Sequence, residues 1–375
     1  MKLITLSLMA TILCVNMALS QTVTTFTDGT PDDGIAVDNL GNIYCAHYLG
    51  DTVFKFTPTG EMTSFITGLN TPNGLAFNSS QELYVCDGQG QMIYKYDING
   101  NQLASYPITG NPSGIIKSFE DDSMIFTIHT NNSIHKLAPD GTITDISLAP
   151  ELNTPVGLAM DENGTIYVGN YSNRKIYRVL QSGTVEYIAQ LPTDGGALPN
   201  LGFITYGQGK IWGTTMGSDK IYYVNPNGVD DYTLFAGSTQ GSDDGDISTA
   251  TFNTPNGIYF NEADGTIYIT DFGTKNLRII SGVLSISDPI VKKNEIQLFP
   301  NPVSDILNIK TELSTASIYS MTIYDLLGRI KYSSEEHPVT NLLLNSIDVS
   351  SFENGTYFMK LDSEGKTATE RFIKE

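Results

Sequence analysis

The sequence repeats one short turn, built around a proline, six times. Aligning the chain on this proline gives spacings of 41, 40, 43, 44 and 56 residues between successive copies. The six copies are Pro31, Pro72, Pro112, Pro155, Pro199 and Pro255. A period of about 40 to 45 residues is that of a four-stranded propeller blade. The repeat therefore predicts an all-β chain folded as a β-propeller.

Each repeat contains four short runs in which apolar and polar residues alternate, such as "GLAMD", "IYVGN", "KIYRV" and "TVEYIA". Alternation with a period of two indicates strands. Turns such as "DENG" and "NPNG" between the runs carry the Asn, Asp and Gly residues that hairpins require. A single four-stranded unit cannot bury its own faces, so the units must stack around an axis.

The number of strands indicates how the propeller closes. The sixth repeat has only three predicted strands, whereas residues 22–29 resemble the fourth strand that it lacks. We therefore expect a propeller at 21–284 with six blades, whose N-terminal strand completes the last blade. An open array of repeats with capping units is the alternative, and it leaves both the spare and the missing strand unexplained.

The first 20 residues have the pattern of a secretory signal peptide. One lysine precedes an apolar run, and Ala18-Leu19-Ser20 forms a small-x-small cleavage site. The run is shorter than a membrane span, and no later segment is apolar enough to cross a bilayer. We therefore expect the mature chain to be exported, with no transmembrane segment.

The charge limits the possible partners. The whole chain has a net charge of −20, and residues 21–295 contain 13 basic and 30 acidic side chains. Such an acidic surface repels phosphate backbones, so nucleic acid is not an expected partner. Cations and basic partners are favoured instead.

The pattern changes after a predicted linker at 285–295. Residues 296–375 contain alternating strands broken by Gly and Asn turns, which predicts a small Ig-like β-sandwich. Their ordered motifs are Phe299-Pro300-Asn301-Pro302, Leu307-x-Ile309, Tyr324-Asp325-x-x-Gly328-Arg329 and Gly355-x-Tyr357. This set resembles the type A C-terminal sorting domain of type IX secretion cargo in the Bacteroidetes. The resemblance implies recognition by the type IX machinery, export through the periplasm and outer membrane, and a secreted or cell-surface location.

The residue before the glycine of each turn is the most variable and is predicted to face the mouth of the central channel. Glycine lets the chain turn sharply into the channel strand. The variable residues are Asp33, Asn73, Ser113, Val156, Leu201 and Asn256. A second loop on the same face is expected to contribute His47, Asp87, His129, Asn170, Thr215 and Asp271.

From these two sets the sequence predicts a ligand-binding site at Asp33, Asn73, Asn256, His47, Asp87 and Asp271. Asp33, Asn73 and Asn256 belong to adjacent blades and form a polar sector, whereas Val156 and Leu201 make the opposite side apolar. Such a mouth can hold a small ligand. The alternative is that each Asn or Asp only hydrogen-bonds its own turn.

The repeat also resembles NHL-type propellers. The match is strongest in the last unit, where Asp244-Gly245, Ala250, Phe252 and Pro255-x-Gly257 follow the NHL order. This resemblance implies a binding scaffold. A second resemblance, to gluconolactonase-like propellers, implies a divalent, calcium-like cation in the channel, with Asp33, Asn73 and Asn256 as its candidate ligands. Val156 and Leu201 occupy positions where that family requires oxygen ligands.

The sequence therefore favours a binding module for a protein, peptide or glycan without a cofactor. The alternative is a metal-dependent lactonase. No catalytic residue and no Ser/His/Asp combination can be identified from the residues alone.

Overall fold

The computed structural model describes residues 21–27, 29–193, 200–283, 297–312, 319–325, 329–336, 342–363 and 366–375. The predicted signal peptide, Pro199 and the predicted linker lie outside the described residues. The chain divides into two compact units, Met1–Leu284 and Ser285–Glu375, which are described separately. Within the described ranges, no helix is long and apolar enough to cross a membrane. The 3₁₀ turn η1 (His129–Asn131) lies in the first unit.

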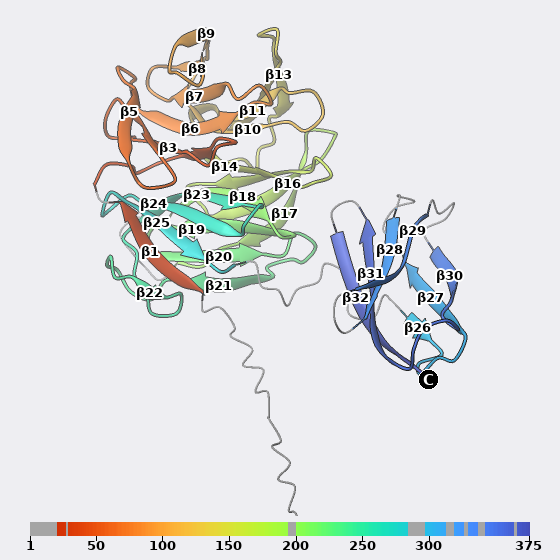
Figure 1. Ribbon diagram of the computed structural model, residues 1–375. Helices are drawn as coiled ribbons and strands as arrows, with labels where there is room; N and C mark the ends of the chain where they lie inside the picture. The colour runs from red at the N-terminus through yellow and green to blue at the C-terminus, as the bar shows by residue number, and fades with distance from the viewer. Residues whose placement is uncertain are drawn as a thin grey trace, which may run out of the picture. The chain divides into compact units, whose positions relative to one another are not determined.

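Six antiparallel sheets form the first unit, which is the all-β, six-bladed propeller that the repeat predicts (Figure 1). Blades 1 to 5 are β2–β5 (Ile35–Val37, Ile43–Ala46, Val53–Phe56, Met62–Ile66), β6–β9 (Pro72–Phe77, Leu83–Asp87, Met92–Tyr96, Gln102–Pro107), β10–β13 (Pro112–Lys117, Met124–Ile128, Ser133–Leu137, Ile143–Ser147), β14–β17 (Pro155–Met160, Ile166–Asn170, Lys175–Val179, Val185–Gln190) and β18–β21 (Leu201–Gly207, Lys210–Thr215, Lys220–Val224, Tyr232–Ala236). Blade 6 contains β23–β25 (Pro255–Asn261, Thr266–Asp271, Asn276–Ser281), β1 (Thr22–Thr27) and β22 (Gly245–Asp246).

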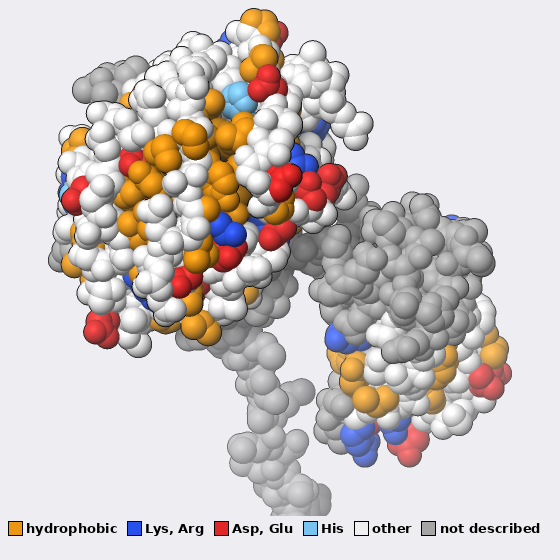
Figure 2. Space-filling view, turned by 90° about the horizontal axis from the view of Figure 1, so that it is seen from above, with side chains coloured by type: hydrophobic (Ala, Val, Ile, Leu, Met, Phe, Trp, Pro, Cys, Tyr) orange, Lys and Arg blue, Asp and Glu red, His pale blue; other side chains and the backbone are white. Residues whose placement is uncertain are grey.

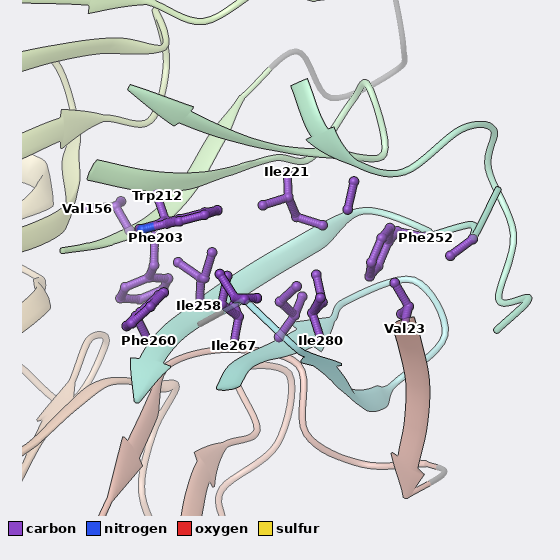
Figure 3. Close-up of a cluster of buried hydrophobic side chains, with 14 residues drawn as sticks. Val23, Val156, Phe203, Trp212, Ile221, Phe252, Ile258, Phe260, Ile267 and Ile280 are labelled. Atoms are coloured by element: carbon purple, nitrogen blue, oxygen red, sulfur yellow. The ribbon is translucent and has the colours of Figure 1, made fainter. Parts of the chain in front are cut away.

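The N-terminal strand closes the propeller, as predicted. Strand β1 pairs antiparallel with β25, and Thr22 lies opposite Ser281. Val23 is fully buried and belongs to the same apolar cluster as Phe252 and Ile280 (Figure 3). The first strand of the chain therefore supplies part of the core of the last blade.

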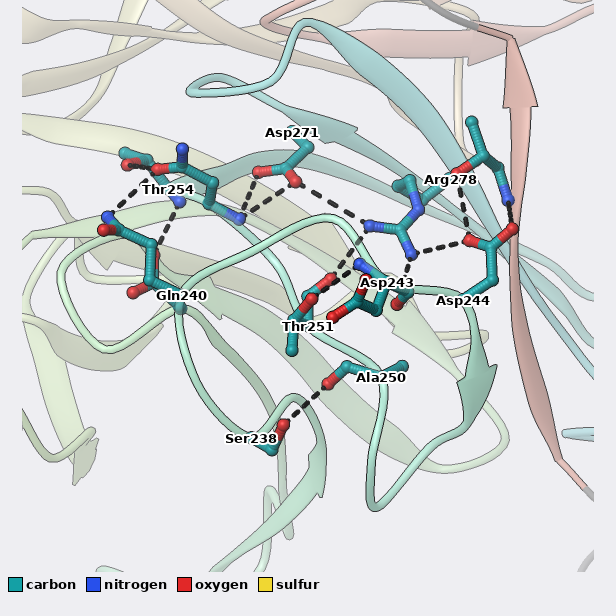
Figure 4. A network of polar contacts seen from close by, with 12 residues as sticks. Ser238, Gln240, Asp243, Asp244, Ala250, Thr251, Thr254, Asp271 and Arg278 are labelled. Atoms are coloured by element: carbon teal, nitrogen blue, oxygen red, sulfur yellow. Dashed lines mark hydrogen bonds and ion pairs between the residues drawn. The ribbon is translucent and has the colours of Figure 1, made fainter.

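A buried arginine in blade 6 adds a polar link to the closing strand (Figure 4). Arg278 is fully buried, and its Nη2 lies 2.8 Å from Asp244 Oδ1. The same Asp244 carboxylate accepts hydrogen bonds from the Thr25 N–H at 3.0 Å and the Thr25 hydroxyl at 2.9 Å. Arg278 also donates to the carbonyl oxygen of Thr251 at 2.9 Å. One guanidinium thus joins β25, the loop after β22 and, through Asp244, strand β1.

The glycine of the repeated turn is required by close packing between blades. A Cβ built on Gly257 would lie 2.2 Å from the carbonyl oxygen of Asp33 in the next blade. A Cβ on Gly114 would lie 1.8 Å from the carbonyl oxygen of Val156. Both distances are far below van der Waals contact, so any side chain here would push neighbouring blades apart.

The sequence-based explanation of these glycines, a sharp turn that needs glycine, is corrected by the backbone angles. Positive φ occurs instead at the threonine before the proline, with values of 65° at Thr71, 49° at Thr154 and 61° at Thr254. A β-branched residue rarely adopts this conformation. The left-handed backbone conformation therefore occurs at the threonine before the proline, whereas the glycine is needed because a side chain there would collide with the next blade.

The second unit has two sheets around one core. Its sheets are β26-β27-β30 (Gln297–Phe299, Ile306–Glu312, Leu342–Asp348) and β29-β28-β31-β32 (Ile330–Glu336, Tyr319–Asp325, Gly355–Ser363, Lys366–Lys374). Leu307 and Ile309 from one sheet and Ile323, Met359 and Phe372 from the other share a single buried cluster. Such packing of two sheets is that of a small β-sandwich.

Replacing Arg278 with Met should test the closure. The variant leaves Asp271 and Asp244 without their guanidinium, so we expect the free energy of unfolding to fall by about 3–5 kcal/mol. Urea denaturation of the full chain measures this change. The control variant Arg178→Met removes an ion pair with the exposed Glu186 and a hydrogen bond to the Pro226 carbonyl oxygen, so its expected loss is about 1–2 kcal/mol. Equal losses in the two variants would contradict the closing role.

Candidate ligand-binding site

A cavity of about 230 Å³ lies at the mouth of the channel, and all six blades contribute to its wall. Its lining residues are Asp33, Tyr48, Thr71, Asn73, Gly88, Asn111, Pro112, Ser113, His129, Val156, Tyr171, Phe203, Met216, Asn256 and Phe272. A second cavity, of about 300 Å³, is lined by the inner strands at the other end of the channel. Figure 2 shows one face of the propeller, with hydrophobic side chains gathered across its middle.

The polar side of the mouth contains three of the residues selected from the sequence. Asp33, Asn73 and Asn256 all line the cavity. The Ser113 hydroxyl donates to Asn73 Oδ1 at 3.3 Å, and Asn256 Nδ2 donates to the carbonyl oxygen of Asp32 at 3.2 Å. The predicted polar sector therefore exists as one wall of the cavity.

Asp33 differs from the other residues of this wall because part of its carboxyl group has no partner. Its side chain is buried, with 3% of the residue exposed, and Oδ1 has no hydrogen bond within the described part of the chain. Burial, followed by the neighbouring Asp32, raises the pKa of Asp33 well above its ordinary value. The Gly34 N–H, Lys275 and Asn256 oppose this shift. Asp33 is therefore a buried acid on the cavity wall, with one oxygen that the described protein leaves without a partner.

Aromatic rings from four of the six blades also line the mouth. They belong to Tyr48, Tyr171, Phe203 and Phe272. Burial raises the pKa of Tyr171, and Tyr48 and Asp33 add to the increase, so the two phenols and the carboxyl group lie near one another. His129 contacts the Tyr171 ring edge to face at a centroid distance of 6.1 Å, and burial lowers the pKa of its imidazole. The cavity thus joins an acid and amides to aromatic rings.

The apolar residue contributed by blade 5 is Phe203, whereas the sequence predicted Leu201. In blade 5, Leu201 pairs with Thr215. The equivalent pair in blade 3 is Pro112 with Ile128. Leu201 therefore occupies the proline position and packs into the core between blades 4 and 5. The irregular "LPNLG" segment shifts the chain by two residues, so Phe203 reaches the cavity.

The second predicted loop set is displaced by one residue in five of the six blades. His47, Asp87, Asn170, Thr215 and Asp271 do not line the cavity, whereas the next residues do; these are Tyr48, Gly88, Tyr171, Met216 and Phe272. A shift of one residue along an extended chain moves a side chain to the other face. His129 is the one member of the predicted set that lines the mouth.

The displaced polar residues hold the loops between blades. The Asp87 carboxylate accepts the Asn70 N–H at 2.9 Å, and the Asp271 carboxylate accepts the Asn253 N–H at 2.9 Å. His47 Nε2 lies 3.9 Å from Asp32 Oδ2. Asp87 and Asp271 therefore form hydrogen bonds within the protein's own loops, which is close to the alternative to ligand binding that the sequence left open.

A divalent cation does not fit this wall. Among the described residues there is no group of three or more His, Cys, Asp or Glu side chains that could hold a metal ion. At the mouth, Asp33 is the one lining carboxylate, and Asn73 Oδ1 already accepts a hydrogen bond from Ser113. Val156 and Phe203 supply no oxygen, whereas calcium takes about six to eight oxygen ligands.

The structure also brings together a Ser/His/Asp set that the sequence did not reveal. His135 Nε2 lies 2.7 Å from Ser133 Oγ, and His135 Nδ1 lies 2.9 Å from Asp145 Oδ1. Ser133 is 2% exposed, whereas the Asp145 side chain is 62% exposed. A nucleophile must be accessible, so this burial is the reverse of what catalysis requires. The set stabilises the outer strands of blade 3.

Comparison with known families agrees with this architecture. The sequence profile described as the virginiamycin B lyase family matches residues 5–274, which is most of the chain. The chain belongs to the virginiamycin B lyase family. No curated protein matches it.

Several solved structures resemble this family member. They include virginiamycin B lyase from Staphylococcus aureus (17% identity, TM-score 0.53, covering 70% of this chain and 98% of that one). Another is a gluconolactonase from Xanthomonas campestris, with 18% identity and a TM-score of 0.56, covering 70% of this chain and 89% of that one. A third is an auxiliary nutrient binding protein from Bacteroides thetaiotaomicron, with 15% identity and a TM-score of 0.60, covering 70% of this chain and 76% of that one. At these identities the likeness establishes the propeller fold.

The C-terminal unit of this family member has a separate match. Residues 297–375 match the secretion system C-terminal sorting domain. The predicted type IX sorting domain is thus confirmed, and the protein is exported to the cell surface or secreted.

The buried Asp271 should make stability depend on pH. Burial raises its pKa to about 7 from the ordinary value of 3.8. The folded state then holds a proton that the unfolded state releases, so the free energy of unfolding should fall between about pH 4 and pH 7. Asp271→Asn keeps a hydrogen-bond acceptor for Asn253 and should flatten this fall. Urea denaturation across this range measures the slope, with Glu61→Gln as an exposed control. A slope unchanged in Asp271→Asn would refute the assignment.

Proposed function

We propose that this propeller is an exported binding protein whose channel mouth holds one unit of a peptide or glycan. The observation that supports this most is the mixed lining of the cavity, which combines Asp33, Asn73 and Asn256 with the rings of Tyr171 and Phe272. Amide and carboxyl groups fix the orientation of a ligand, and aromatic rings provide contact area.

The size of the cavity limits what enters it. Its volume of about 230 Å³ is below the usual range for a whole drug-sized ligand, which is about 300–1,000 Å³. A single amino-acid side chain or sugar ring fits this space. The rest of the ligand would lie across the surrounding face.

Export places this site where such ligands occur. The sorting domain directs the protein to the cell surface or the medium. The similar Bacteroides proteins are described as auxiliary nutrient binding proteins. These descriptions agree with a binding role. For this chain, the proposed binding role rests on the cavity at the channel mouth.

Phe272→Ala should weaken binding without unfolding the protein. Phe272 lies at the rim, so the variant removes aromatic contact area from one wall, and we expect affinity to fall about 10-fold or more. Peptide and glycan arrays probed with the full chain identify a ligand, and titration gives the affinities. The matched control is Phe119→Ala, because Phe119 is exposed and lines the other cavity. A ligand that binds both variants equally would place its site elsewhere.

The lactonase alternative requires Asp33 to be the main anionic ligand of a cation. We expect no turnover of lactones, with or without calcium, manganese or zinc, because the wall has one carboxylate and an apolar half. We also expect no conversion of quinupristin, the compound bound in a solved structure of virginiamycin B lyase from Staphylococcus aureus, as followed by liquid chromatography. Metal-dependent turnover that is lost in Asp33→Asn would overturn the binding proposal.

A further inference from the structure

We propose that the ligand unit held at the channel mouth carries a protonated amine, which pairs with Asp33 and lies against the aromatic wall. This inference rests on the proposed binding function and names the chemistry of its ligand. A side-chain ammonium, a free amino terminus or an amino sugar would present this group.

The first argument is charge balance. The residues that line the cavity include Asp33 and no Lys or Arg. Asp33 Oδ1 is buried and has no hydrogen-bond partner among the residues described. A ligand with N–H donors supplies the missing partner, and a positive charge makes that hydrogen bond stronger.

The second argument comes from the ammonium group that the protein already places beside the mouth. Lys275 Nζ lies 2.7 Å from Asp32 Oδ2 and 3.8 Å from the centroid of the Phe272 ring. Asp32 thus has its own cation, which also rests on an aromatic face. Asp33, the adjacent acid, has the rings of Tyr48 and Tyr171 nearby; Lys275 lowers its pKa, but Asp33 forms no ion pair among the residues described.

The aromatic wall suits an organic cation better than a metal ion. A ring face attracts an ammonium group, most strongly where both are shielded from water. Phe203 and Phe272 add apolar rings to the cavity wall, while Tyr48 and Tyr171 place phenol groups near the carboxyl group. The excess of acidic residues between 21 and 295, 30 against 13 basic ones, also raises the local concentration of cations.

Pairing with an amine should release a proton. Asp32, Lys275 and Asn256 act on Asp33, which in turn raises the pKa of the neighbouring Tyr48 and Tyr171. Burial and Asp32 raise the pKa of Asp33, which favours its neutral form in the free protein. Its carboxyl proton passes to solvent, and the resulting carboxylate pairs with the ammonium group. Affinity should rise as the pH increases toward the pKa of free Asp33, because less proton has to be displaced.

A pair of probes that differ in one group tests this inference. Benzylamine and benzyl alcohol have nearly the same shape, and their binding to the full chain can be measured by ligand-observed NMR titration. We expect benzylamine to bind about 10-fold more tightly or better, as for a hydrogen bond to a charged group. Asp33→Asn should remove this preference. Glu61→Gln, which removes an exposed acid from the same blade, should retain it.

The outcomes separate the two proposals. Equal affinity of the two probes, or a preference that survives in Asp33→Asn, overturns the amine inference. If an array ligand still binds through Phe272, the binding function stands without it.

Discussion

The close approach of neighbouring blades at the central channel determines the rest of this structure. The glycine of each inner strand packs against the backbone of the next blade, and Gly257 makes this contact with Asp33, which joins the last blade to the first. Because the backbones touch, the residue before each glycine is held at the mouth with little freedom. The backbone contacts are therefore repeated around the ring, and the chemistry of the mouth is set by the residue before the glycine in five blades together with residues of the neighbouring loops, such as Tyr48, Tyr171 and Phe272.

Two buried acids near the junction of blades 6 and 1 show how the same scaffold separates stability from binding. Asp271 accepts the Asn253 N–H and lies 3.9 Å from the Arg278 guanidinium, so the fold itself satisfies it. Asp33 faces the cavity with one oxygen left without a partner. Since an unsatisfied buried polar group costs free energy, Asp33 destabilises the free protein, and a ligand that pairs with it would recover that free energy on binding.

The repeat predicted the strands, the number of blades and the closing strand because all three depend on period and alternation. It also selected Asp33, Asn73 and Asn256, since the proline and glycine on either side fix their place. It failed for Tyr48, Tyr171 and Phe272 because a one-residue error in register reverses the face of a side chain. The Arg278 network was not predictable, because Asp244 lies 34 residues away and no local pattern joins the two.

The position of β1 also makes closure of the propeller depend on the presence of its last blade. Strand β1 is the first to be synthesised, yet its partner β25 ends at Ser281, so the ring closes after all six blades exist. A chain cut short anywhere before that point leaves Val23 without its core and an unpaired strand edge. Such edges are the surfaces through which sheets aggregate and by which unfinished proteins are removed. The ring can therefore close only when the propeller chain extends through β25.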